Sequence, residues 1–276
     1  MRNKLLVLDF DGTLCLGDDP VLAYAEQVDS VLSDRGLADR LPRPVHQIVA
    51  EALSINRLLA PEITYRADGT PHAVAEEVSG EDPTHRTEAH PVSGPLQDGY
   101  QLTQLLAHQA GLTGAESGAC FRQARRNLVA AGLESTDIHA PEGAAQLLDE
   151  LRRRAVVVLI TNSPAAGFAP WLEVLGLAES FDAVINDARK PFGMPAALDA
   201  ARTAGQEATS ESAASRDVLS IGDIWRNDLA HVSAAGGTTI LIDRFNTGLG
   251  APDHRVADWT EAVPALRSWA AHQPSS

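Results

Sequence analysis

The sequence predicts an α/β fold, in which a mostly helical domain is inserted near the start of a doubly wound, Rossmann-like parallel sheet. From about residue 140 onward, short uninterrupted apolar runs alternate with amphipathic helical patterns. This is the order expected of a parallel sheet with helices on both faces. A similar apolar run stands near the N-terminus, and residues 18–139, which are rich in helical patterns, separate it from the others.

The strand predictions rest on apolar runs that are rich in β-branched residues. Strands buried on both faces lack the polar alternation of half-exposed strands. Five segments have this character, the third of them weakly: 5–8, 156–160, 183–185, 218–221 and 239–242. Amphipathic stripes between them predict helices that cover the sheet, at 142–153, 170–177 and 226–235.

Residues 18–139 are expected to form a second domain, because a crossover between parallel strands needs only about a dozen residues. Helical patterns occur at 20–35, 45–59, 96–111 and 117–132. The polar stretch 67–94 is expected to be a long loop. The predicted organisation is therefore a core made of residues 1–17 and 140–272, with an inserted helical domain at 18–139.

The composition excludes several classes of protein. The chain has 22 basic and 37 acidic residues, a formal net charge of −15, so it would repel nucleic acids and anionic membranes, and neither is expected as a partner. The two cysteines stand in no CxxC or disulfide pattern, and the apolar run after Lys4 is too short for a signal peptide. These features favour a cytoplasmic protein and leave its oligomeric state open. Arg125 and Arg126, on the 117–132 helix, are expected to face solvent rather than a ligand.

Polar side chains follow the predicted strands at the edge where parallel α/β sheets bind ligands. They are Asp9 and Asp11, Thr161 and Asn162, Lys190, and Asp223 and Asp228. Crowded carboxylates repel one another unless a cation lies among them, and a set of oxygen ligands favours Mg²⁺. The sequence therefore predicts phosphoryl transfer assisted by a divalent ion.

Each of these groups suits one part of that chemistry. Asp9 can attack phosphorus, which divides hydrolysis into two easier steps through an aspartyl-phosphate. Asp11 can protonate the leaving alcohol and then deprotonate the attacking water. Thr161 can hold a phosphate oxygen, and Lys190 can supply positive charge in the transition state.

The four segments resemble, in order, the four motifs of the haloacid dehalogenase-like hydrolase superfamily, and they match its phosphatase branch. The most specific is Asp9-x-Asp11-Gly12-Thr13. The similarity covers residues 1–17 and about 140–265, and the insertion stands where the family carries its variable cap. It implies a Mg²⁺-dependent phosphatase that acts on a small phosphorylated metabolite.

The resemblance also implies roles for single residues. Asp9 would be the nucleophile, and Thr161, Asn162 and Lys190 would contact the phosphate, with Lys190 also steadying Asp9. The implied metal ligands are Asp9, the backbone carbonyl of Asp11, Asp223, and Asp228 in or just outside the coordination sphere.

Other branches of the superfamily fit less well. Its true dehalogenases have no second aspartate of the Asp11 kind and use no metal, so Asp11 together with Asp223 argues against dehalogenation. The phosphonate-cleaving branch needs a cap lysine, and residues 18–139 contain no lysine. Two alternatives stay open: a phosphomutase or phosphotransferase of the same superfamily, and a binding or regulatory protein that has kept the fold but lost turnover.

Overall fold

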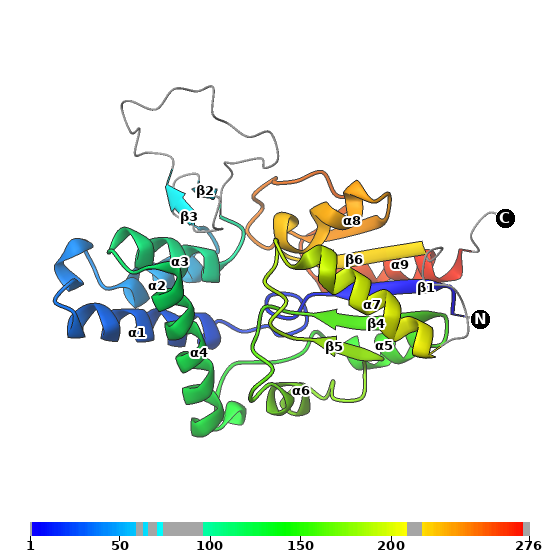
Figure 1. Ribbon diagram of the computed structural model, residues 1–276, viewed down its shortest axis with the longest axis horizontal. Helices are drawn as coiled ribbons and strands as arrows, with labels where there is room; N and C mark the ends of the chain where they lie inside the picture. Colours follow the sequence, from blue (N-terminus) through cyan, green and yellow to red (C-terminus); the bar gives the residue numbers. More distant parts are fainter. Residues whose placement is uncertain (1, 59–62, 66–70, 74–95, 209–216, 273–276) are drawn as a thin grey trace. The chain divides into compact units, whose positions relative to one another are not determined.

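The computed structural model describes residues 2–58, 63–65, 71–73, 96–208 and 217–272. The chain divides into two compact units, Met1–Asp19 with Arg126–Ser276, and Pro20–Arg125. Figure 1 shows the sheet of the first unit and the helices of the second. Of the helices within the described ranges, none combines the length and the apolar character needed to cross a bilayer.

The first unit is built on a six-stranded parallel sheet with the order β5-β4-β1-β6-β7-β8. Its strands are β1 (Lys4–Leu8), β4 (Ala155–Ile160), β5 (Ala183–Ile185), β6 (Asp217–Gly222), β7 (Thr238–Ile242) and β8 (His254–Val256). From β1 the chain moves outward through β4 and β5, then returns to the other side of β1 and moves outward through β6. This reversal is the switch point at which doubly wound sheets bind ligands. The predicted fold class and the five predicted strands are confirmed.

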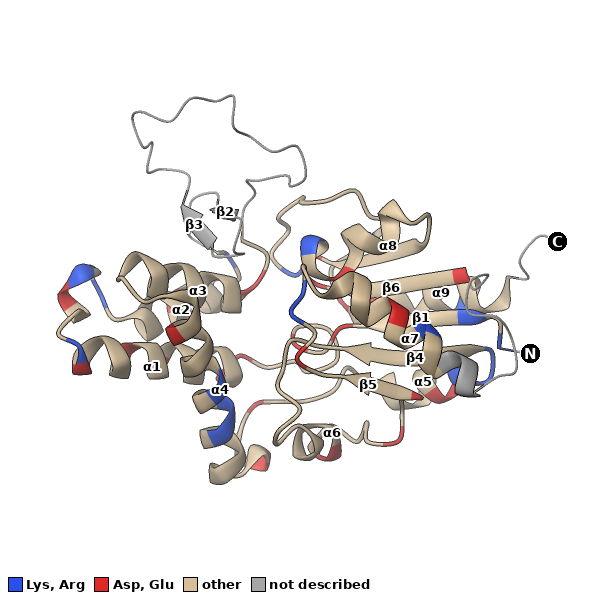
Figure 2. Ribbon diagram, viewed as in Figure 1, with Lys and Arg blue, Asp and Glu red and all other residues tan. Residues whose placement is uncertain are grey.

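Helices cover both faces of this sheet (Figure 1). Because side chains alternate along a strand, Leu5 and Val7 pack on one face and Leu6 and Leu8 on the other. The first face is covered by α7 (Met194–Ala208) and α8 (Ala230–Ala234), and the second by α5 (Ala144–Arg152), α6 (Ala169–Val174) and α9 (Trp259–Ala271). Figure 2 shows β1, β4 and β6 uncharged over most of their length, as burial on both faces requires.

The second unit contains most of the predicted insertion. Its helices are α1 (Asp19–Asp34), α2 (Val45–Ser54), α3 (Gly99–Gln109) and α4 (Gly114–Ala131), with a two-stranded ribbon of β2 (Ile63–Tyr65) and β3 (Pro71–Ala73). The helix α4 runs on into the first unit. The rings of Tyr24, Tyr100 and Phe121 pack together, with centroids 5.7–6.4 Å apart. These aromatic contacts join α1, α3 and α4.

Some details of this region differ from the sequence-based expectations. The helix α2 ends at Ser54 rather than at 59, because Asn56 adopts a positive φ of 49° that a helix cannot continue. Arg126 is exposed as expected, but Arg125 is buried, with its guanidinium 5.6 Å from the Phe121 ring centroid. Within the predicted loop 67–94, residues 71–73 form β3, and the rest lies outside the described residues.

Candidate active site

The loop after β1 places Asp9 at the carboxyl end of the central strand. The N–H groups of Leu14 and Cys15 both donate to the Phe10 carbonyl, at 2.9 and 2.8 Å, so the chain turns sharply after Asp9. Gly12 lies within this turn at a φ of +80°, which favours glycine. A β-carbon at Gly12 would lie 2.2 Å from Oδ2 of Asp223. The glycine therefore lets the Asp223 carboxylate approach the backbone of the first loop.

The segment after β6 supplies the other acidic groups. Asp223 directly follows the strand, and Asp228 lies on a π-helical turn, Trp225–Leu229. Such turns are frequent at functional sites. Oδ2 of Asp228 accepts a hydrogen bond from the Ile224 N–H at 3.0 Å, and the Asp228 carbonyl accepts one from Ser220 Oγ at 2.8 Å. These bonds fix Asp228 close to the end of β6.

Three buried carboxylates meet at this edge of the sheet. Asp9, Asp223 and Asp228 each offer an oxygen, and these oxygens all lie within 4.8 Å of one another. All three residues are buried. Such close carboxylates repel one another in a buried setting, so the cluster is suited to a cation.

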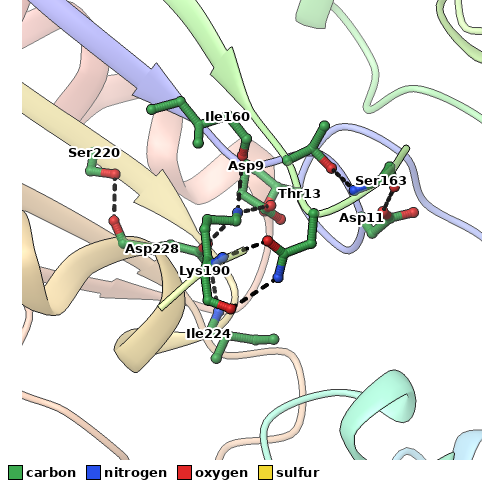
Figure 3. A network of polar contacts seen from close by, with 11 residues as sticks. Asp9, Asp11, Thr13, Ile160, Ser163, Lys190, Ser220, Ile224 and Asp228 are labelled. Atoms are coloured by element: carbon green, nitrogen blue, oxygen red, sulfur yellow. Dashed lines mark hydrogen bonds and ion pairs between the residues drawn. The ribbon is translucent and has the colours of Figure 1, made fainter. Parts of the chain in front are cut away.

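Lys190 supplies one positive charge to this cluster, and Figure 3 shows its contacts with Asp9 and Asp228. Its Nζ donates to Asp9 Oδ1 at 2.5 Å, to Asp228 Oδ1 at 2.6 Å and to the Ile160 carbonyl at 2.9 Å. These three bonds use all three hydrogens of the ammonium group. Its side chain is only 3 % exposed, so it forms a buried ion pair with each of the two carboxylates.

The pKa values of Asp9 and Lys190 reflect this burial. Burial raises the pKa of Asp9 to about 7, and the negative charges of Asp228 and Asp11 add to the rise, while Lys190 opposes it. Burial would lower the pKa of Lys190, but the carboxylates of Asp228 and Asp9 outweigh it and hold that pKa above its ordinary value. The ammonium thus stays charged, and Asp9 needs further positive charge to ionise fully at neutral pH.

The donor set fits a hard divalent cation. One ammonium cannot balance three carboxylates, and the groups that converge here are oxygen ligands of the kind Mg²⁺ prefers. Zinc sites, by contrast, mostly use cysteine and histidine.

The loop after β4 contributes Thr161, Asn162 and Ser163. Thr161 is buried, and its Oγ1 accepts a hydrogen bond from the Ser163 N–H at 3.0 Å. Ser163 Oγ donates to Asp11 Oδ2 at 2.8 Å (Figure 3). The Asn162 side chain bonds to the backbone of Lys190. This loop therefore contacts both the proton-transfer candidate Asp11 and the lysine.

The structure brings the sequence-predicted residues together at one edge of the sheet. The hydrogen bonds, the ion pairs and the carboxylate cluster join Asp9, Asp11, Asn162, Lys190, Asp223 and Asp228, with Thr161 in the same loop as Asn162. Their catalytic and ligand roles stay predictions.

Ser163 was not predicted as a site residue. Its position directly after Thr161 and Asn162, at the end of a strand, was the only signal in the sequence.

The chain is similar to known hydrolases. A family model described as haloacid dehalogenase-like hydrolase matches residues 3–236. A comparison with the curated proteins finds no significant match.

Solved structures share the fold at low sequence identity. A predicted phosphoglycolate phosphatase from Haemophilus somnus 129pt is 15% identical, with a TM-score of 0.51 and coverage of 96% of this chain and 98% of that chain. A haloacid dehalogenase-like family hydrolase from Streptococcus pneumoniae is 13% identical, with a TM-score of 0.52 and coverage of 96% and 100%. An L-2-haloacid dehalogenase is 16% identical, with a TM-score of 0.48 and coverage of 97% and 100%. The likeness to the first two structures, at these low identities, shows the fold alone.

Proposed function

The chain belongs to the haloacid dehalogenase-like hydrolase family, and we propose that it is a Mg²⁺-dependent phosphatase. Its substrate would be a phosphomonoester of a small metabolite, hydrolysed through an aspartyl-phosphate. The observation that carries the proposal is the cluster of Asp9, Asp223 and Asp228, in which one carboxylate oxygen from each residue lies within 4.8 Å of the other two. Attack of a carboxylate on a halogenated carbon gains nothing from two further carboxylates, whereas phosphoryl transfer needs the cation that they would hold.

The metal would be held by the carboxylates of Asp9, Asp223 and Asp228 and by the backbone carbonyl of Asp11. When bound, Mg²⁺ would neutralise phosphate charge and align the phosphoryl group. The acidic cluster fits this role because Lys190 alone leaves it with excess negative charge.

In the first step, an Asp9 oxygen forms a bond to phosphorus while the bond from phosphorus to the substrate's alcohol oxygen breaks. Asp11 gives its proton to that oxygen. In the second step, water attacks phosphorus, Asp11 takes the proton from the water, and the bond between phosphorus and Asp9 breaks. Inorganic phosphate leaves, and both aspartates return to their starting forms.

Lys190 and Thr161 would stabilise the charge that develops on the phosphoryl oxygens. Lys190 already holds Oδ1 of Asp9, so it keeps the nucleophile oriented while its charge acts on the phosphate. Thr161 Oγ1 accepts from Ser163 N–H, which leaves the hydroxyl hydrogen of Thr161 able to donate to a phosphate oxygen.

The test is a panel of phosphorylated metabolites assayed with Mg²⁺, with Asp9→Asn as the matched inactive variant. Release of inorganic phosphate by the wild type, and not by Asp9→Asn, supports the proposal. Parallel assays follow phosphosugar isomerisation, phosphoryl transfer to a sugar hydroxyl, and halide release from 2-haloacids. Turnover in any of these without phosphate release contradicts a phosphatase, and no turnover in any of them favours a binding or regulatory protein.

A further inference from the structure

The Asn162 side chain bonds to both polar backbone groups of Lys190. Its Oδ1 accepts from the Lys190 N–H at 2.6 Å, and its Nδ2 donates to the Lys190 carbonyl at 3.1 Å. An amide is suited to this because it carries an acceptor and a donor side by side. With both groups held, the position of the Lys190 α-carbon is fixed relative to the loop after β4.

The path of the chain toward Lys190 explains why this position needs support. Asp187 and Arg189 have positive φ values of 50° and 54°, a region that residues with a side chain rarely adopt. Other bonds hold the preceding residues to the same loop: the Asp187 N–H donates to the Ser163 carbonyl at 3.0 Å, and Asn186 Nδ2 donates to it at 3.2 Å. Among the hydrogen bonds described between these loops, only the two from the Asn162 side chain involve the N–H and the carbonyl of Lys190 itself.

The place of the Lys190 backbone determines what its ammonium reaches. Nζ lies at the end of a flexible four-carbon chain, yet it must reach Asp9, Asp228 and the Ile160 carbonyl together. A shift of the backbone would lengthen these contacts or break them. Since a displacement of about 1 Å in an active site can lower a rate by about a hundredfold, the support of Lys190 bears directly on turnover.

We propose that Asn162 is a positioning residue that acts through Lys190, holding its backbone so that the ammonium orients Asp9. The inference rests on the proposed function, in which Lys190 steadies both the nucleophile and the phosphate. It differs from the direct phosphate contact that the family resemblance implies for Asn162. The two roles make different predictions for kinetics, and variants of the two residues separate them.

The first comparison is Asn162→Ala with Asn186→Ala. Asn162 is exposed, so its truncation opens no core cavity. Its loss is expected to lower kcat by about ten- to a hundredfold with little change in KM, because the ammonium is misplaced. Asn186→Ala removes an amide bond between the same two loops but leaves the bonds to Lys190, so its kcat should stay close to that of the wild type. Equal losses from both variants would overturn the proposal.

The second comparison is a double-mutant cycle with Lys190→Met, which removes the ammonium but keeps the backbone that Asn162 holds. If Asn162 acts through Lys190, Asn162→Ala has no further effect on kcat in the Lys190→Met background. The same fold loss in both backgrounds, or a raised KM with unchanged kcat, would overturn the proposal and indicate a direct contact with substrate.

The same cycle is repeated with the Kd of inorganic phosphate, in the presence of Mg²⁺, in place of kcat, so that a variant too slow to assay still gives a result. The expectation is again that Asn162→Ala has no further effect in the Lys190→Met background. Urea unfolding shows whether each variant is folded. If Lys190→Met does not fold, the contrast between Asn162→Ala and Asn186→Ala decides. A wild type that releases no phosphate counts against the proposed function, whereas an active wild type with additive effects counts against the role of Asn162 alone.

Discussion

The carboxylate of Asp223 lies against the backbone of Gly12, so closely that a β-carbon at residue 12 would be 2.2 Å from Oδ2 of Asp223. This contact joins the loop after β1 to the end of β6. The same Asp223 carboxylate belongs to the acidic cluster with Asp9 and Asp228.

Gly12→Ala is expected to displace Asp223 and to disrupt the cluster. Phosphate release should fall by at least about a hundredfold, since a misplacement of about 1 Å has that effect. The variant is assayed for kcat and for Mg²⁺ affinity by calorimetry. The control is Gly143→Ala, because Gly143 also has a positive φ, of +72°, but a β-carbon there would meet no atom within 4 Å. If both variants lose activity equally, the strain of a positive φ and not the contact with Asp223 is responsible.

Asp228→Asn is expected to weaken the cluster without changing its shape. The amide keeps an oxygen for the Ile224 N–H but loses the negative charge that pairs with Lys190. We expect Mg²⁺ affinity to fall by about 10- to 100-fold, as for residues that support or ligate a metal. Calorimetric titration with Mg²⁺ measures the change. Asp187→Asn is the matched control, since that carboxylate is exposed and accepts from the Ala165 N–H outside the cluster. Unchanged affinity in Asp228→Asn would exclude Asp228 from the metal site.

Mg²⁺ is expected to stabilise the folded protein as well as to support activity. Binding to the folded state alone adds about 2.7 kcal/mol to the free energy of unfolding when Mg²⁺ is at about 100 times its Kd. The thermal midpoint should therefore rise with Mg²⁺ in the wild type and rise much less in Asp223→Asn.

Chelation by EDTA should abolish phosphate release and added Mg²⁺ should restore it. Activity that survives chelation would contradict the proposed metal dependence.

Asp182 is expected to make stability depend on pH. Burial opposes its ionisation, but the Val157 N–H and the guanidinium groups of Arg2 and Arg152 outweigh burial and hold the pKa of Asp182 below its ordinary value. The ionised form therefore stabilises the fold above the unfolded pKa, about 3.9. This contribution is lost as the pH falls through the lower folded pKa.

Asp182→Asn should accordingly lower the free energy of unfolding at pH 7 by about 1–3 kcal/mol, and the difference from the wild type should shrink below about pH 4. Urea unfolding between pH 7 and pH 3 measures both. Asp199→Asn is the control, because the Asp199 side chain is 78 % exposed and its ion pair with Arg202 is expected to contribute little at any pH. A difference for Asp182→Asn that is constant with pH would contradict this account.

Parts of the fold without a strong apolar pattern were not predicted. The strand β8 has only three residues, and His254 and Arg255 are exposed, so it shows no apolar run. The helix α9 is also absent from the predicted helices, although its sequence carries a signal for a helix start. Asp258 accepts a hydrogen bond from the Glu261 N–H, and Glu261 accepts one from the Ala257 N–H, an arrangement close to a capping box. The burial of Arg125 depends on the Phe121 ring beside it, which a helical pattern does not reveal.

The amino-acid sequence alone is enough to predict the parallel sheet and the set of polar groups at its edge. Continuous apolar runs such as 156–160 are stable only when covered on both faces, and residues that directly follow such strands must emerge at the carboxyl edge. Which of these groups touch is known only from the folded chain. The bond from Lys190 to Asp9 joins residues 181 positions apart. The bonds from Asn162 reach Lys190 at the end of a segment in which Asp187 and Arg189 have positive φ values. Such contacts depend on where the backbone runs in space, and residue types alone do not determine that path.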